Sequence, residues 1–350
     1  MSKFLSSRLC SLKEYVPGEQ PTDMKYIKLN TNESPFMPSP EVLKAVTEGR
    51  AKNLQLYPEP DCTKLCMALA KRYGVEKENI IVGNGSDEIL NFCFLAYFDK
   101  NSPVVFPNIT YGFYKVFGDL YGSDYTEIPL THDLSVDIND YIGINKNIVL
   151  ANPNAPSGKA LDKKDIERII ASNPDNIVLI DEAYVDFGGQ SVADLVKKYD
   201  NLIVVMTFSK SRSLAGARVG FAIANSNLIG DLNRIKYSIN PYNINSMSQR
   251  AALAALESAQ YYDNNCKTII ETREFFVKEL DRLGFETLPS KANFVFTKKS
   301  GVSGFELYTK LKSRGILVRH FDKEPISYYL RITIGTKQQM MALVSALEEL

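Results

Sequence analysis

Short, continuous apolar runs alternate with segments of helical periodicity along most of the chain. Such runs, rich in branched side chains, are typical of strands that are buried on both faces of a sheet. We expect these strands at residues 80–82, 103–107, 124–130, 147–151, 177–180, 202–206 and 219–223, with helices between them. The alternation predicts an α/β fold in which a mainly parallel sheet is covered by helices.

The last third of the chain has a different pattern. Residues 227–237 and 245–285 are expected to be mostly helical, with one long helix from about residue 261 to 283. Strands are expected at residues 292–296, 316–319 and 329–333, and a helix ends the chain. We therefore expect a large domain at residues 41–250 and a smaller α/β domain at residues 251–350, completed by the N-terminal arm, residues 1–40.

The N-terminal region is punctuated by proline and glycine. A short helix and then an arm are expected over residues 1–24, followed by an extended segment at 27–35 that ends in a turn-rich patch, and by a helix from Pro40 to about Arg50. A further helix over residues 62–73 ends at Gly74, because glycine commonly follows a helix C-terminus. Tyr57 lies in the loop between these helices, where packing against Pro58 is the alternative to a functional role.

The composition argues against several functional classes. Lys+Arg and Asp+Glu each number 41, so the formal net charge is zero and indicates no nucleic-acid partner. The five cysteines are scattered and neither of the two histidines has a partner at metal-ligand spacing, so we expect reduced thiols, no metal site and a cytoplasmic location. No apolar run reaches membrane-spanning length, so no membrane partner is expected.

The strand expected at residues 202–206 ends in an unusual sequence, which contains Thr207, Ser209 and Lys210 and is followed by Arg218. Lysine is rarely buried unless it is paired or chemically used. A neutral, desolvated amine can attack a carbonyl carbon to form a Schiff base, and a hydroxyl with a fixed cation nearby suits a phosphate. These residues suggest a lysine that holds pyridoxal phosphate, and an ordinary lysine between a strand and a loop is the alternative.

A glycine-rich loop, residues 83–88 (GNGSDE), connects another expected strand to an apolar helix. Unpaired amides and the helix dipole make such a helix N-terminus suitable for an anion. An ordinary turn, in which Ser86 caps the helix and Asp87 occupies its first turn, explains the same residues.

Polar side chains follow five of the expected strands. In open α/β sheets, ligands bind beyond the carboxyl ends of the strands. Pyridoxal phosphate needs an anion beside its ring nitrogen, donors beside its phenolic oxygen, a phosphate site and a surface that stacks on its ring. We assign Asp181 to the ring nitrogen, Asn154 and Tyr184 to the phenolic oxygen, and Tyr111 to the stacking surface. The phosphate site is assigned to Ser86, Asp87, Thr207, Ser209 and Arg218. Lys210 would form the Schiff base and act as the acid and base for the α-proton.

The chain resembles the class I/II aminotransferases of fold type I along essentially its full length. The resemblance rests on residues 152–158 (NPNAPSG), 181–184 (DEAY), 209–210 (SK) and 215–221 (AGARVGF). Within that family the chain is most similar to members that use histidinol phosphate. The matching residues are 29–35 (LNTNESP), 57–58 (YP), 83–88 (GNGSDE) and 330–336 (LRITIGT).

The resemblance implies a homodimer with a shared active site, in which Tyr57 reaches the partner's cofactor phosphate. It implies that Arg331 binds the carboxylate of glutamate or 2-oxoglutarate and, with Arg319, the phosphate of histidinol phosphate. Asn30 would lie near the substrate, and Asn293 is a weaker candidate. From the sequence pattern alone, an arginine on the strand at 329–333 fits a surface ion pair equally well.

The implied reaction exchanges an amino group between L-glutamate and imidazole-acetol phosphate, in histidine biosynthesis. An aromatic-amino-acid aminotransferase or a phospho-amino-acid decarboxylase of the same fold is the alternative enzyme. A regulatory module that binds pyridoxal phosphate is the non-enzymatic alternative, although no basic arm or helix-turn-helix segment is evident in the sequence.

Overall fold

A seven-stranded sheet forms the centre of the fold in the computed structural model, which describes residues 5–6, 9–47 and 52–350. The strand order is β2 (Ile80–Gly83), β8 (Gly220–Ala224), β7 (Leu202–Thr207), β6 (Val178–Asp181), β5 (Asn147–Ala151), β3 (Val104–Pro107) and β4 (Tyr125–Ile128). Strands β7, β6, β5, β3 and β4 are parallel to one another, whereas β8 is antiparallel to both of its neighbours. The expected, mainly parallel α/β sheet is therefore confirmed.

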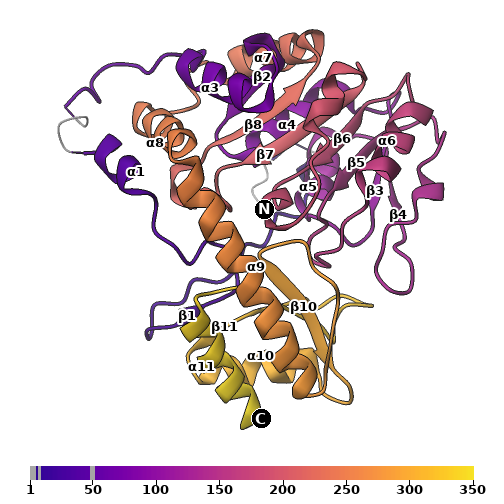
Figure 1. The fold of residues 1–350 in the computed structure, drawn as a ribbon. Coiled ribbons are helices and arrows are strands. Elements are labelled where there is room, and N and C mark those ends of the chain that lie inside the picture. The colour runs from indigo at the N-terminus through magenta and orange to yellow at the C-terminus, as the bar shows by residue number, and fades with distance from the viewer. Residues whose placement is uncertain (1–4, 7–8, 48–51) are drawn as a thin grey trace.

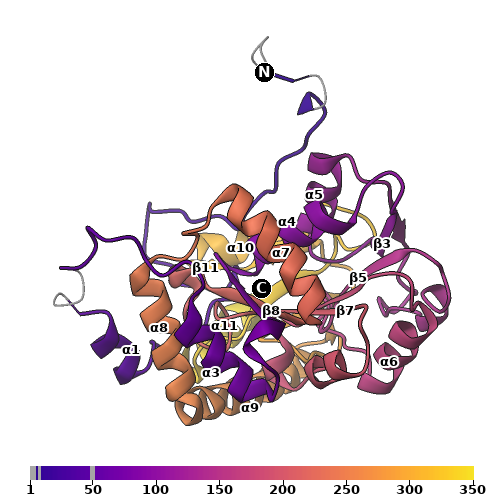
Figure 2. The same cartoon turned by 90° about the horizontal axis from the view of Figure 1, so that it is seen from above.

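Both faces of this sheet are buried because successive side chains of each strand enter opposite cores. In β5, Ile148 and Leu150 belong to one core and Val149 to the other. Helices α4 (Ser86–Tyr97), α5 (Phe113–Tyr121) and α7 (Ser226–Ile239) contribute buried residues to one core. Helices α3 (Thr63–Tyr73), α6 (Lys163–Ser172) and α8 (Ser246–Glu257) contribute to the other, and Figure 2 shows this layered arrangement from above.

Local sequence explains which face of a helix is buried and where helices begin and end. Helix α6 buries Ile166, Ile169 and Ile170, which lie on one face at helical spacing. Helix α3 ends at Gly74, which adopts a left-handed conformation with φ of 65°. Thr336 and Gln339 form a capping box at the start of α11 (Lys337–Glu348).

The C-terminal part of the chain builds a second, smaller sheet below the first (Figure 1). Its order is β12 (Arg319–His320), β13 (Leu330–Thr333), β10 (Phe294–Lys299) and β9 (Phe285–Thr287), all antiparallel. The long helix α9 (Ala259–Arg282) passes from the large sheet to this part, where α10 (Gly304–Ser313) and α11 also lie. Strand β1 (Ile27–Lys28) pairs in parallel with β11 (Ile316–Leu317), so the N-terminal segment does join this part.

The C-terminal part has its own hydrophobic core, which includes Leu29, Phe276, Ile332 and Leu343. Because these cores are separate, we propose two domains, with limits near those given above: residues 41–250 for the large domain and residues 1–40 with 251–350 for the small one. The boundary falls after α8 rather than at residue 250, since Ala251, Ala252, Ala254 and Ala255 belong to the core of the large sheet.

Two local expectations need correction. The described residues of the arm, 5–6 and 9–24, contain no α-helix, and α1 (Pro40–Ala45) ends well before Arg50, which lies outside the described residues. The mostly helical segment at 245–285 and its long helix are confirmed, and α8 and α9 are divided at Ser258, whose hydroxyl bonds to Glu41 and to the Ala254 carbonyl oxygen. The remaining short elements are 3-10 turns: η2 (Lys77–Asn79), η3 (Ile138–Asp140), η4 (Val185–Phe187), η5 (Ala193–Lys197) and η6 (Ala215–Ala217).

Candidate active site

A cavity of about 460 Å³ opens where the carboxyl ends of the parallel strands meet the smaller sheet. Residues from both sheets, and from the N-terminal arm, line it. Most of the residues singled out from the sequence are among them: Asn30, Ser86, Asp87, Tyr111, Asp181, Tyr184, Thr207, Ser209, Lys210, Arg218, Arg319 and Arg331.

Lys210 follows the last residues of β7, as expected, and its side chain lines the cavity. Its Nζ donates a hydrogen bond to the Thr31 carbonyl oxygen at 3.3 Å and lies 5.7 Å from the centroid of the Tyr184 ring. The Tyr184 hydroxyl in turn accepts a hydrogen bond from Asn32 at 3.0 Å. No acidic side chain neutralises the amine in the described part of the chain, so Lys210 is available to a ligand.

Asp181 ends β6 and is buried in the same cavity, with 4% of its surface exposed. The Tyr114 hydroxyl donates to its Oδ2 at 2.8 Å, and the Ala183 amide donates to its Oδ1 at 3.1 Å. Burial raises the pKa of Asp181 to about 6, and these two hydrogen bonds oppose that rise. Asp181 is thus an oriented carboxylate that needs a cationic partner.

The glycine-rich loop and Arg218 form a cradle at the N-terminus of α4. A Cβ on Gly220 would lie 2.3 Å from the Ser86 amide nitrogen, and one on Gly85 would lie 2.4 Å from Arg218 Nη2. Arg218 adopts a left-handed φ of 51°, a conformation that is uncommon for residues other than glycine and concentrates at functional sites. Because β8 is antiparallel, its start brings Arg218 to the edge where the other strands end.

Asp87 links two of the predicted cofactor residues. Its Oδ1 accepts a hydrogen bond from the Tyr111 hydroxyl at 2.7 Å, and its Oδ2 accepts one from Arg218 Nη2 at 3.0 Å. Arg218 Nη1 also contacts Ser209 Oγ at 3.4 Å, and burial raises the pKa of Tyr111. The Asp87 carboxylate therefore positions an aromatic ring and a guanidinium on the same wall.

Arg331 lines the cavity and forms no ion pair with any acidic side chain that the structure describes. Its Nη2 donates to the Asn30 carbonyl oxygen at 3.0 Å, while its buried Nε has no acceptor among the described residues. Burial lowers the pKa of Arg331, because the charged form is desolvated. Arg319 donates to the carbonyl oxygens of Val16 and Pro17, both at 3.1 Å.

Three predicted residues do not line this cavity. Asn154 is buried and lines a neighbouring cavity of about 260 Å³, where its amide bonds to Ile109, Thr110 and Ser157. Tyr57 is 82% exposed and stacks on Tyr242. Asn293 is buried, and its amide donates to the Asn32 carbonyl oxygen.

Sequence reasoning missed two residues of the site. Tyr114 lies behind Asp181, and its place in the first turn of α5, three residues after Tyr111, was the available signal. Tyr15, on the N-terminal arm, lines the cavity and stacks on Phe113 with 4.2 Å between ring centroids. Its contact depends on how the arm crosses the molecule, which no local pattern encodes.

Comparison with known proteins identifies the class. The family model for aminotransferases of class I and II matches residues 24–347, and the chain belongs to this family.

Its curated relatives are more specific. The chain is 49% identical over 349 residues to a histidinol-phosphate aminotransferase of Brachyspira hyodysenteriae, covering 99% of both chains. It is also 49% identical to the histidinol-phosphate aminotransferase of a Marinomonas species, covering 100% of both. The crystal structure of the Sinorhizobium meliloti histidinol-phosphate aminotransferase in complex with pyridoxal-5'-phosphate has a TM-score of 0.89 at 24% identity, covering 100% of this chain and 98% of that one. No described helix has both the length and the apolar character needed to span a membrane.

Proposed function

We propose that this aminotransferase uses pyridoxal phosphate to interconvert L-histidinol phosphate and 2-oxoglutarate with imidazole-acetol phosphate and L-glutamate, in histidine biosynthesis. The observation that carries the proposal is the shared cavity, in which the Lys210 amine, the buried Asp181 carboxylate and the Arg218 cradle lie together. The names of relatives at 49% identity support the choice of substrate.

The residues present fit the cofactor. The cradle of Ser86, Ser209 and Arg218 would hold the phosphate, since a side chain on Gly85 or Gly220 would fill the space. The Tyr111 ring would stack on the cofactor ring, with Asp87 fixing its hydroxyl. The Tyr184 hydroxyl, which accepts a hydrogen bond from Asn32, would donate its own proton to the phenolic oxygen of the cofactor. The Thr207 hydroxyl accepts a hydrogen bond from the Ser209 amide and so orders the cradle. Asn154, which lines the adjoining cavity, would be the second donor to the phenolic oxygen of the cofactor.

Bound pyridoxal phosphate supplies an aldehyde for the substrate amine and an electron-withdrawing ring that stabilises negative charge at the substrate Cα. Lys210 Nζ holds and releases the proton that moves at the substrate α-carbon. Asp181, which Tyr114 orients, would keep a proton on the ring nitrogen of the cofactor. Removing the Lys210 amine would abolish this proton transfer, and removing the Asp181 carboxylate would slow it.

Two arginines that line the cavity would bind the anionic groups of the substrates. Arg331 keeps an unpaired, buried Nε–H, a donor that costs free energy until an acceptor arrives. A carboxylate or phosphate oxygen supplies that acceptor, and Arg319 and Asn30 lie on the same wall. The site therefore suits glutamate and a phosphate monoester in turn.

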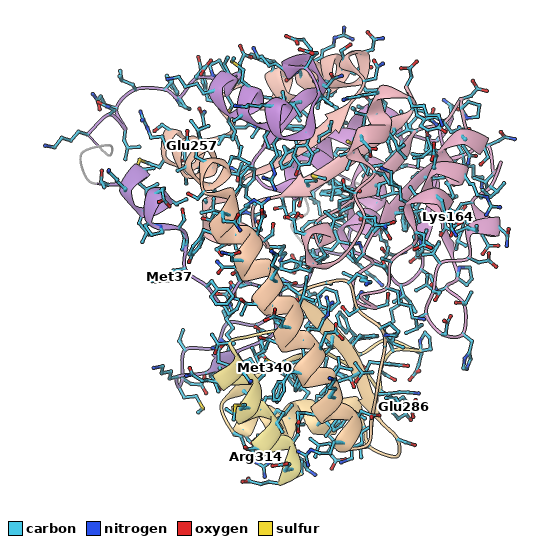
Figure 3. The ribbon with its side chains drawn as sticks, viewed as in Figure 1. Met37, Lys164, Glu257, Glu286, Arg314 and Met340 are labelled. Carbon is cyan, nitrogen blue, oxygen red and sulfur yellow. The ribbon has the colours of Figure 1, made fainter. Side chains whose placement is uncertain are left out.

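We also propose a homodimer with a shared site. Large apolar side chains are exposed around α1 and the loop that follows it, and Met37, labelled in Figure 3, projects from the segment before α1 with 73% of its surface exposed. Such a patch is typical of an interface. The others are Leu43, Leu54, Leu56 and Tyr57. A cytoplasmic location is part of the proposal, because the five cysteines are free thiols.

A substrate panel tests the proposal. The purified enzyme should transaminate histidinol phosphate with 2-oxoglutarate, and Lys210→Ala should abolish turnover. Activity on phenylalanine without activity on histidinol phosphate would instead identify an aromatic aminotransferase, and release of CO₂ a decarboxylase. A Lys210→Ala protein with wild-type turnover would refute the assigned chemistry.

A further inference from the structure

A buried lysine lies on α7, outside the lining of the active-site cavity. Lys236, on α7, is 2% exposed, and its Nζ donates a hydrogen bond of 2.6 Å to the carbonyl oxygen of Pro60. This is the only hydrogen bond of the ammonium group among the described residues, and Nζ also lies 5.2 Å from the centroid of the Tyr237 ring. A buried cation costs free energy unless it is paired, and a methionine would fill the same space without that cost. The position therefore calls for a role for the Lys236–Pro60 contact.

Pro60 belongs to a short loop, residues 57–61, that α7 and α8 hold at several points. The Tyr237 hydroxyl bonds to Asp61 at 2.5 Å, and Gln249 Nε2 donates to the Glu59 carbonyl oxygen at 3.0 Å. Two of the five loop residues are prolines, which lack an N–H and so cannot secure the loop with their own amides. The loop depends on donors that come from the two helices.

The side chain at the start of this loop is Tyr57, which is 82% exposed. Among the described residues its aromatic partner is Tyr242, which stacks on it with ring centroids 4.6 Å apart and comes from the connection between the same two helices. Burial therefore does not fix the Tyr57 ring, and the loop backbone has to. A preorganised side chain loses less conformational entropy when it binds.

We propose that Lys236 is a positioning residue that fixes the 57–61 loop so that Tyr57 reaches the cofactor phosphate in the partner's active site. The inference rests on the proposed homodimer and cofactor, and adds that a buried cation in one protomer sets cofactor affinity in the other. Lys236→Met leaves the Pro60 carbonyl oxygen without its charged donor, so the loop and Tyr57 lose their fixed position.

Mixed dimers test this inference, because they separate the loop from the site it serves. Two differently tagged protomers are co-expressed and purified by both tags. Cofactor bound at Lys210 is fixed with borohydride, and the labelled Lys210 peptide is quantified by mass spectrometry over a range of pyridoxal phosphate concentrations. A Lys210→Ala protomer gives no label, so the readout reports one site per mixed dimer.

The Lys236→Met homodimer should need about tenfold more cofactor for half-saturation, the size expected when one hydrogen bond to a charged group is lost. Paired with a Lys210→Ala protomer, Lys236→Met should return to the wild-type value, because the intact loop then comes from the partner. A Lys210→Ala, Lys236→Met double variant paired with a wild-type protomer should show the tenfold defect. A defect that instead follows the Lys210-bearing protomer would overturn the inference.

Two further variants keep the outcomes distinct. Tyr57→Phe should show the same pattern between protomers; if it does and Lys236→Met does not, the inference fails and the shared site stands. If Tyr57→Phe changes no half-saturation value, the shared site fails and the inference with it.

Gln249→Leu replaces Lys236→Met should that variant not fold. Lys198→Met removes an exposed ion pair far from this loop in the sequence and is the control, for which cofactor affinity should be unchanged.

Discussion

Replacing Tyr114 by phenylalanine removes one hydroxyl from the interior of the large domain and leaves the ring in place. That hydroxyl is fully buried and donates to Asp181 Oδ2 at 2.8 Å. A hydrogen bond to a charged group contributes about 1.5–3 kcal/mol, and 1.36 kcal/mol corresponds to one pKa unit. Without it the pKa of Asp181 should rise from about 6 by roughly one to two units.

The sign of the effect on stability follows from linkage. Burial holds the folded-state pKa of Asp181 above its ordinary value of 3.8, so the folded protein binds this proton more tightly than the unfolded chain does. The contribution of this proton to the free energy of unfolding is fully present at acid pH, and it is lost as pH rises from about 4 to about 6. In the apoprotein of Tyr114→Phe the loss should continue to about one to two pH units higher.

Difference infrared spectroscopy of the apoprotein measures this pKa directly, through the C=O stretch of a protonated, buried carboxyl group. The band belongs to Asp181 if Asp181→Asn removes it. The groups that face this carboxyl are Tyr114, Asp87 and Lys210. Tyr141→Phe is the matched control, because the Tyr141 hydroxyl is equally buried but has no hydrogen-bond partner among the described residues. An Asp181 pKa that is unchanged in Tyr114→Phe would refute the assigned role of Tyr114.

Other predictions follow from the cradle and the anion site. Gly220→Ala should weaken pyridoxal phosphate binding at least tenfold and lower stability by about 1–3 kcal/mol, since its Cβ would lie 2.3 Å from the Ser86 amide nitrogen; thermal denaturation and cofactor titration measure both effects. Gly230→Ala, in open space on α7, should instead raise the melting temperature slightly, which a lowered value would contradict. Arg331→Lys should raise KM for glutamate and for histidinol phosphate about tenfold or more, because lysine lacks the planar fork, and steady-state kinetics with an unchanged KM would contradict this. Relieving the left-handed φ of 51° with Arg218→Gly should stabilise the backbone but abolish cofactor binding in an equilibrium titration, and retained affinity would exclude the cradle as the phosphate site.

Much of the site could be predicted because the ends of buried strands can be recognised from the sequence. The apolar runs of β5, β6 and β7 are continuous, so the polar residues that follow them stand out, and parallel strands bring their carboxyl ends to one edge. Lys210 and Asp181 were identified in this way, and they line one cavity.

Other features depend on contacts between distant residues. No local sequence pattern predicts the antiparallel direction of β8, which places Arg218. The same holds for the contact of the Tyr114 hydroxyl with Asp181 and for the path of the arm that brings Tyr15 into the cavity. The strand pattern left Arg331 between a surface ion pair and a ligand contact. Only the structure shows that Arg331 bonds to the Asn30 carbonyl oxygen and that its buried Nε lacks an acceptor among the described residues, and the ligand contact stays a prediction.

The sequence by itself determined which segments are buried strands and which residues with reactive or charged side chains follow them, because hydrophobic periodicity and residue chemistry are local. Only the tertiary structure decided which of these side chains share one cavity, which donors hold the Asp181 carboxylate, and that Tyr57 is exposed and lies outside the lining of that cavity. Those outcomes depend on sheet order, strand direction and packing between segments that are far apart in the chain.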